Sequence, residues 1–63
     1  MSNHRIKMRL EGTVSDLEAY LYLLHAMDAK GLIEILQESK PYKNREPSKL
    51  YRVYLDVNLN MDR

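Results

Sequence analysis

The sequence predicts an α+β domain of the β-α-β-β type, with a three-stranded sheet and one helix on one face. Three observations predict it. Apolar and charged residues alternate from Arg5 to Glu11, apolar residues recur at helical spacing after Thr13, and a longer alternation runs from Lys49 to Leu59. A period of two is typical of a strand with one buried face, and spacings of three and four are typical of an amphipathic helix.

The helix is expected over residues 13–29. Thr13 is a favourable N-cap residue, and Gly31 ends the helix because glycine adopts the left-handed conformation that follows a last turn. The apolar stripe that identifies the helix comprises Leu17, Tyr20, Leu21, Leu24 and Met27.

A second strand is predicted over Leu32–Glu38, since Gly31 precedes it and β-branched isoleucines favour a strand. Residues 39–48 are predicted to form a loop, because Pro41 and Pro47 cannot donate backbone hydrogen bonds. Residues 1–63 are expected to form a single domain, with residues 1–4 and 60–63 frayed at its ends.

The connections between these elements suggest a strand order. The helix serves as a crossover between the first two strands, and the last two pair as an antiparallel hairpin. With the longest strand central, the order is 1-3-2, with strands 1 and 3 parallel, as half of a ferredoxin-like unit. The helix then covers the face that carries Ile6, Met8, Leu10, Val53, Leu55 and Val57. The opposite face, here named the open face, has no cover.

The length and composition predict self-association. A chain of 63 residues buries only about 60% of the surface that it exposes when unfolded. Domains of this size often need disulfides, a metal or a partner subunit for stability. There is no cysteine to supply disulfides. His4 and His25 lie far apart in sequence, so no metal site and no cofactor is predicted. Association with further copies of the chain is the stabilising feature that remains.

The formal net charge of +1 excludes a polycation. No apolar run approaches the roughly 18 residues of a membrane span, so no membrane partner is predicted. The N-terminus leads into alternating residues and not into an apolar signal-peptide core. We therefore expect a cytoplasmic protein.

Basic residues gather on the open face and in the loop, which suggests nucleic acid as an alternative partner. Cations that track a backbone, with aromatic rings that stack on bases, are typical of single-strand binding. The simpler interpretation, which we favour, is the solvated face of an edge strand. The candidate contacts are Arg5, Lys7, Arg9, Lys43, Asn44, Arg45, Arg52 and Tyr54.

A third interpretation makes the sheet an interface between copies of the chain. Arg52 would then pair with Asp56 or Glu34 of a partner in a two-fold arrangement. Tyr20 and Tyr22 on the helix are further candidates, or else ordinary residues at the edge of the core. The candidate interface residues are Leu32, Leu36, Leu50 and Tyr54.

Catalysis is not predicted. The only glycines are Gly12 and Gly31, so a glycine-rich phosphate loop is absent from the sequence. Asp16 and Glu18 are explained by the start of the helix, where negative charge is favourable. One helix on three strands also leaves little room for a water-excluding pocket.

Two segments together resemble a known family. They are residues 8–13 and the pattern S-x-P-Y-x-N-R followed by S-K-x-x-R-V-Y in residues 39–54. The combination resembles a family of short, uncharacterised proteins of Gram-positive bacteria that plasmids or phages often carry. This resemblance implies a bacterial setting and an origin in a mobile element, and it assigns a role to no residue.

Overall fold

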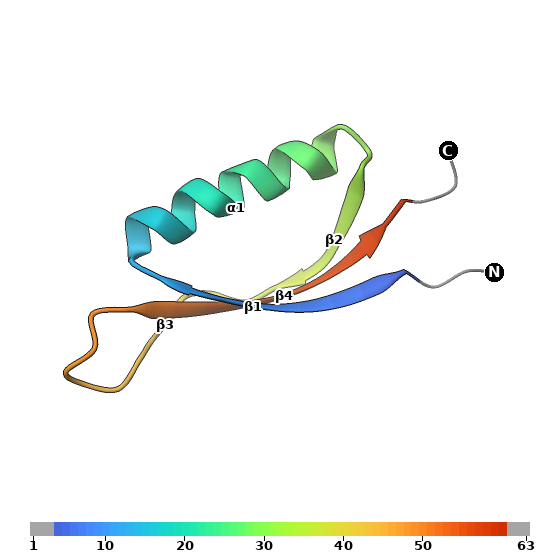
Figure 1. Cartoon of the computed structure of the whole chain (residues 1–63). Coiled ribbons are helices and arrows are strands. Elements are labelled where there is room, and N and C mark those ends of the chain that lie inside the picture. Colours follow the sequence, from blue (N-terminus) through green and yellow to red (C-terminus); the bar gives the residue numbers. More distant parts are fainter. Residues whose placement is uncertain (1–3, 61–63) are drawn as a thin grey trace.

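The computed structural model describes residues 4–60 and shows an α+β fold with one helix and an antiparallel sheet of four strands (Figure 1). Helix α1 lies on one side of the sheet, and no described element covers the other side. The elements are β1 (Arg5–Gly12), α1 (Val14–Ala29), β2 (Ile33–Glu38), β3 (Tyr42–Lys43) and β4 (Tyr51–Leu59).

The longest strand, β4, lies between β1 and β2 and is antiparallel to both. The expectation that the first and last long strands are parallel is therefore wrong. Its error is one of direction: a helical crossover makes β1 and β2 point the same way, so a strand that forms a hairpin with β2 must run against both. The sheet also has four strands and not three, because β3 pairs with the beginning of β4.

Helix α1 begins and ends for the predicted reasons. Thr13 is the N-cap, with an extended backbone, and its Oγ1 accepts a hydrogen bond from the Asp16 N–H at 3.2 Å. At the other end, Gly31 has a φ of +78°, a conformation that costs glycine little and other residues more. The chain can therefore turn directly from α1 into β2.

The core lies between α1 and the inner face of the sheet. Its buried residues come from α1, β2 and β4: Leu17, Leu24, Ile33, Val53, Leu55 and Val57. Met8 and Leu10 pack against this core from β1. Ile6 is not buried as predicted: it lies near the beginning of β1, at the edge of the sheet, and 41% of it is exposed.

A β-bulge interrupts β2 at Leu36. Ile35 lies opposite Val57, but Gln37 lies opposite Asp56, so one residue of β2 has no partner in the register. The bulge changes the face of every later residue, because side chains alternate along a strand. Glu38 consequently lies opposite Leu55 on the helix side, where its Oε1 is 2.7 Å from Nε2 of His25 on α1.

The predicted loop over residues 39–48 is partly strand. Tyr42 lies opposite Arg52, and the Asn44 N–H donates to the Leu50 carbonyl at 3.0 Å, so the connection closes tightly on β4. The Glu46–Pro47 peptide bond is cis.

The predicted frayed ends lie partly outside the described residues, which exclude 1–3 and 61–63. The two residues of these ends that the structure describes, His4 and Asn60, form backbone hydrogen bonds. The Leu59 N–H donates to the His4 carbonyl at 2.9 Å, and the Asn60 N–H donates to the Leu32 carbonyl at 3.2 Å.

Candidate functional site

The open face carries cations and anions side by side. Arg5 Nη2 is 2.9 Å from Asp56 Oδ2, and Arg9 Nη2 is 3.9 Å from Glu11 Oε1. Lys7 lies opposite Asp56 in the register. The carboxylates therefore offset much of the basic character that the alternation of β1 predicts for this face.

Arg52 is held inside a network on the open face. Its Nη1 donates to Asn44 Oδ1 at 2.8 Å and its Nε donates to the Tyr54 hydroxyl at 3.0 Å. Asn44 Nδ2 in turn donates to Glu11 Oε2, which connects the 44–50 loop to β1. Arg52 thus positions its own chain, and its pairing with Asp56 or Glu34 of a partner stays a prediction.

Two tyrosines accompany Arg52. The Tyr42 and Tyr54 ring centroids are 6.3 Å apart with planes tilted by 55°, and the Arg52 guanidinium lies 5.8 Å from the Tyr42 centroid. Tyr42 was not among the predicted site residues, because only β3 pairing brings it to the open face. Its position between two prolines gave no strand signal.

The basic loop residues are less concentrated than predicted. Lys43 lies opposite Tyr51 and therefore points to the other side of the sheet from Tyr42. Its Nζ pairs with Glu46 Oε2 at 2.8 Å. Arg45 is exposed at the tip of the loop. Of the three predicted loop contacts, only Asn44 joins the open-face network.

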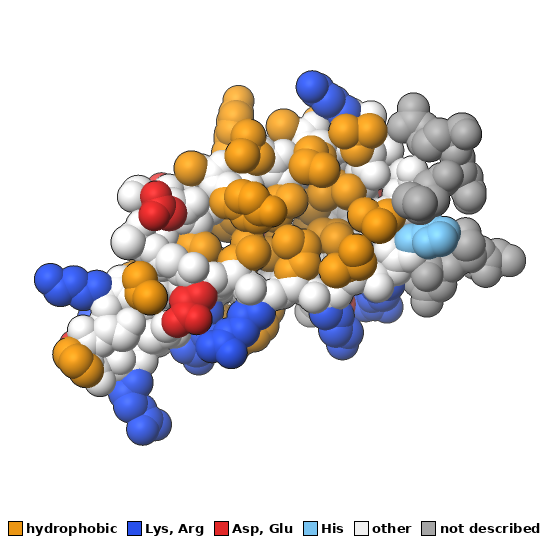
Figure 2. Space-filling model, in the orientation of Figure 1, with side chains coloured by type: hydrophobic (Ala, Val, Ile, Leu, Met, Phe, Trp, Pro, Cys, Tyr) orange, Lys and Arg blue, Asp and Glu red, His pale blue; other side chains and the backbone are white. Residues whose placement is uncertain are grey.

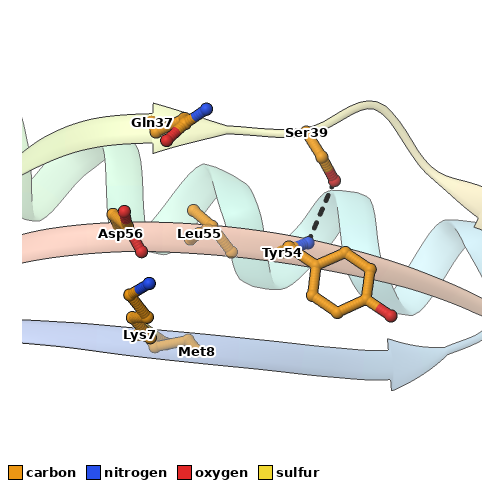
Figure 3. Close-up of a pocket in the computed structure, with 7 residues that line it drawn as sticks. All are labelled: Lys7, Met8, Gln37, Ser39, Tyr54, Leu55 and Asp56. Carbon is orange, nitrogen blue, oxygen red and sulfur yellow. Dashed lines mark hydrogen bonds between the residues drawn. The ribbon is translucent and has the colours of Figure 1, made fainter.

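A hollow of about 310 Å³ lies on the open face over β4 (Figure 3). In this view the side chains of Lys7 and Asp56 point toward one another, and Gln37 and Tyr54 flank them. The Tyr54 N–H donates to Ser39 Oγ at 3.0 Å and ties the β2–β3 connection to β4. This volume is at the lower limit of ligand pockets.

The predicted interface residues do not form one patch. Leu32 lies where β2 begins, beside the end of β4, whereas Leu50 precedes the start of β4. The length of β4, about 30 Å at strand spacing, separates them. Leu36 is exposed at the bulge on the outer strand, and Tyr54 lies on the open face.

Instead, exposed apolar side chains gather where α1 overhangs β1 (Figure 2). Tyr20, Leu23 and Met27 recur at spacings of three and four, so they share one side of the helix. Tyr20 lines a hollow of about 390 Å³ together with Leu10 of β1, which places this side of the helix above β1. We name Ile6, Tyr20, Leu23 and Met27 the apolar strip; their exposed fractions are 41%, 45%, 56% and 37%.

The sequence signalled the apolar strip only weakly. Tyr20 and Met27 belong to the predicted helical stripe, and the sequence leaves Tyr20 open between an interface and the edge of the core. Two other members of the same stripe, Leu17 and Leu24, face the sheet and are buried. Periodicity predicts an apolar face, but the angular width of that face decides which of its residues reach the sheet.

Among residues 4–60, no strand pairs with the outer backbone edge of β1. Because the His4 carbonyl faces β4, the alternation of an antiparallel ladder turns the N–H and C=O groups of Arg5, Lys7, Arg9 and Glu11 away from β4. None of the hydrogen bonds among residues 4–60 uses these groups.

The opposite edge of the sheet is closed. The outward N–H of Ile35 donates to Asp28 Oδ2 of α1 at 3.0 Å. Two further features interrupt the same edge: the β-bulge at Leu36, and Pro41, which has no N–H to donate. Bulges and prolines are devices that prevent a strand edge from pairing, so β1 is the edge that remains available.

Comparison with protein-family models, curated proteins and solved structures finds no significant match. Within residues 4–60, no group of three or more His, Cys, Asp or Glu is placed to hold a metal ion. In the same part of the chain, no helix has the length and apolar character needed to cross a membrane.

Proposed function

We propose that this chain is a small homo-oligomeric interaction module that acts by binding and not by catalysis. The observation that carries the proposal is the apolar strip beside the outer edge of β1, with which no other strand of residues 4–60 pairs. Exposed apolar surface that is contiguous, and not scattered, is typical of an interaction site.

The shape of the molecule supports this proposal. The chain measures 45 × 20 × 12 Å, with a radius of gyration of 13.2 Å. A compact domain of this length has a radius of gyration of about 11 Å. The helix and the sheet therefore form a flat structure, and its core within residues 4–60 contains six buried residues. Apolar side chains on a second side of α1 are typical of a helix that is covered on more than one side.

The test is the mass in solution as a function of concentration, measured by light scattering from low to high micromolar protein. We expect a mass that rises toward a multiple of the 7.5 kDa of one chain. A mass of one chain throughout the series would contradict the proposal.

The second candidate is a nucleic-acid-binding accessory protein that uses the open face. The observation that favours it is the pair of half-exposed rings, Tyr42 and Tyr54, beside Arg52. Aromatic rings on a sheet are platforms for unstacked bases. The pairing of Arg5 with Asp56 weighs against it, because a paired cation gains less from a phosphate.

This candidate predicts salt-sensitive binding of single-stranded oligonucleotides, since phosphate contacts release counterions. Tyr54→Ala should weaken binding by about 1–3 kcal/mol if a base stacks on the ring. Fluorescence anisotropy at low salt measures both effects. Lack of binding by the unmodified chain would exclude this candidate and leave the first one untouched.

The setting of this function is a proposal as well. We propose a cytoplasmic protein of bacterial, plasmid or phage origin, on the basis of the pattern in residues 39–54. The half-ferredoxin-like description is similarly a proposal about relationship, supported by the split β-α-β arrangement of β1, α1 and β2 around β4.

A further inference from the structure

We infer that two copies of this chain associate edge to edge through β1, antiparallel, with Arg9 of each copy on the two-fold axis. The inference rests on the proposed function, and it names the partner, the surface and the register. The result is one continuous sheet across both copies, with both α1 helices on the same side.

The backbone of β1 supplies the hydrogen bonds. With Arg9 on the axis, the outward N–H and C=O groups of Lys7, Arg9 and Glu11 meet Glu11, Arg9 and Lys7 of the second copy. These are hydrogen-bonded pairs of an antiparallel ladder, which exchange both bonds. The β2 edge cannot serve in the same way, because Asp28 already occupies the Ile35 N–H.

Charge favours this register over the one with Met8 on the axis. Residues opposite one another must point to the same face, so the register shifts in steps of two residues and the two-fold axis moves by one residue at each step. With Arg9 on the axis, Lys7 lies opposite Glu11 of the second copy twice, against one Arg9–Arg9 contact. With Met8 on the axis, Arg5 would lie opposite Glu11 twice and Lys7 would lie opposite Arg9 twice. Like charges directly opposite are destabilising, so the like pairs then offset the opposite ones.

The apolar side chains favour this register over the one with Leu10 on the axis. In this register Ile6 of one copy lies opposite Gly12 of the other, and Met8 lies opposite Leu10. Gly12 has no side chain, and the hollow of about 390 Å³ beside it is lined by Leu10, Leu17 and Tyr20. Ile6 is large, apolar and 41% exposed, and in this register it reaches the hollow of the second copy. With Leu10 on the axis, Arg9 would lie opposite Glu11 twice, but Ile6 would extend past the hollow and fewer residues would pair.

Single-cysteine variants test the register directly, because the chain has no cysteine of its own. In Arg9→Cys the two thiols face each other across the axis, at a separation that a disulfide spans in an antiparallel pair. Mild oxidation should convert the variant into a covalent dimer on a non-reducing gel. The matched control is Lys7→Cys, on the same strand and face, whose two thiols lie about 14 Å apart along the strands.

The outcomes separate the inference from the proposed function. A dimer in solution with a disulfide at position 9 and little at position 7 supports both. A dimer that forms no disulfide in Arg9→Cys, or that forms it equally in Lys7→Cys, overturns this inference and leaves the oligomer standing. A monomeric unmodified chain overturns both.

A second variant pair examines the apolar contact. Ile6→Glu places a carboxylate in the hollow of each partner and should raise the dimer dissociation constant by about 100-fold or more. Tyr22→Glu is the control, since Tyr22 is 75% exposed and lies outside the apolar strip. Circular dichroism confirms that each variant folds. A folded Ile6→Glu variant with unchanged dissociation would contradict the inference.

Discussion

Thr13 shows how a single hydroxyl positions the helix. Its Oγ1 accepts from the Asp16 N–H, one of the donors that the first helical turn leaves without a partner. Thr13 also separates β1 from α1 by one residue, so the cap sets the direction in which the helix crosses the sheet.

We therefore expect Thr13→Ala to lower the free energy of unfolding by about 1 kcal/mol. Thr13→Ser keeps the hydroxyl and should stay close to the unmodified chain. Urea unfolding followed by circular dichroism measures both, at one protein concentration because association shifts apparent stability. Equal loss in the two variants would show that the hydroxyl is not the cause.

Asp28 is the residue that distinguishes the two edges of the sheet. It projects from the last turn of α1 to the Ile35 N–H, so a carboxylate takes the place that another strand would occupy. It was not among the predicted site residues, since a part-buried aspartate near a helix end has no sequence pattern of its own.

Replacement of this carboxylate, Asp28→Ala, should cost about 1–3 kcal/mol of unfolding free energy, because it leaves a part-buried N–H without its acceptor. Glu18→Ala on the exposed surface of the same helix is the control and should change stability by about 0.5 kcal/mol or less. Thermal unfolding of the pair at equal concentration is the measurement. Similar losses in both variants would contradict the assigned role.

At the scale of the elements, the predictable features are those that local physics determines. The bounds of α1 follow from Thr13 and Gly31, and the inner face of β4 follows from its alternation. The bulge at Leu36 and strand β3 could not be predicted, because they depend on contacts across the sheet, such as that of Ser39 with Tyr54.

The candidate site was less predictable than the fold. Alternation correctly places Arg5, Lys7 and Arg9 on the open face, but it cannot show that Asp56 and Glu11 lie within reach of two of them. The apolar strip depends on where α1 sits over the sheet. That position results from packing, not from periodicity.

The turn between α1 and β2 gives a prediction at this scale. Gly31→Ala should destabilise the chain by about 1–2 kcal/mol, because a Cβ disfavours the left-handed backbone even where no neighbour lies within 4 Å. Gly31→Asn should cost less, since asparagine tolerates this conformation better. Chemical denaturation distinguishes the two, and equal costs would point to a different cause.

At the scale of the whole molecule, residues 4–60 form a sheet that α1 covers on one face, with a closed edge at β2 and a free edge at β1. The free edge and the apolar strip lie side by side. One partner can therefore bond to the outward N–H and C=O groups of β1 and cover the apolar strip at the same time. In the proposed dimer, a second copy supplies the complementary charges and an isoleucine for the hollow beside Gly12. The proposed interface is therefore the β1 edge, and the open face stays accessible in it.

The most direct measurement of this claim is amide hydrogen exchange along β1, resolved by NMR at low and high protein concentration. Met8 and Leu10 bond to β4 within one chain, so their amides should exchange slowly at every concentration. The outward amides of Lys7, Arg9 and Glu11 should exchange fast in the monomer and become slow as the dimer forms. Fast exchange of these three amides in a sample that is fully oligomeric would contradict the account.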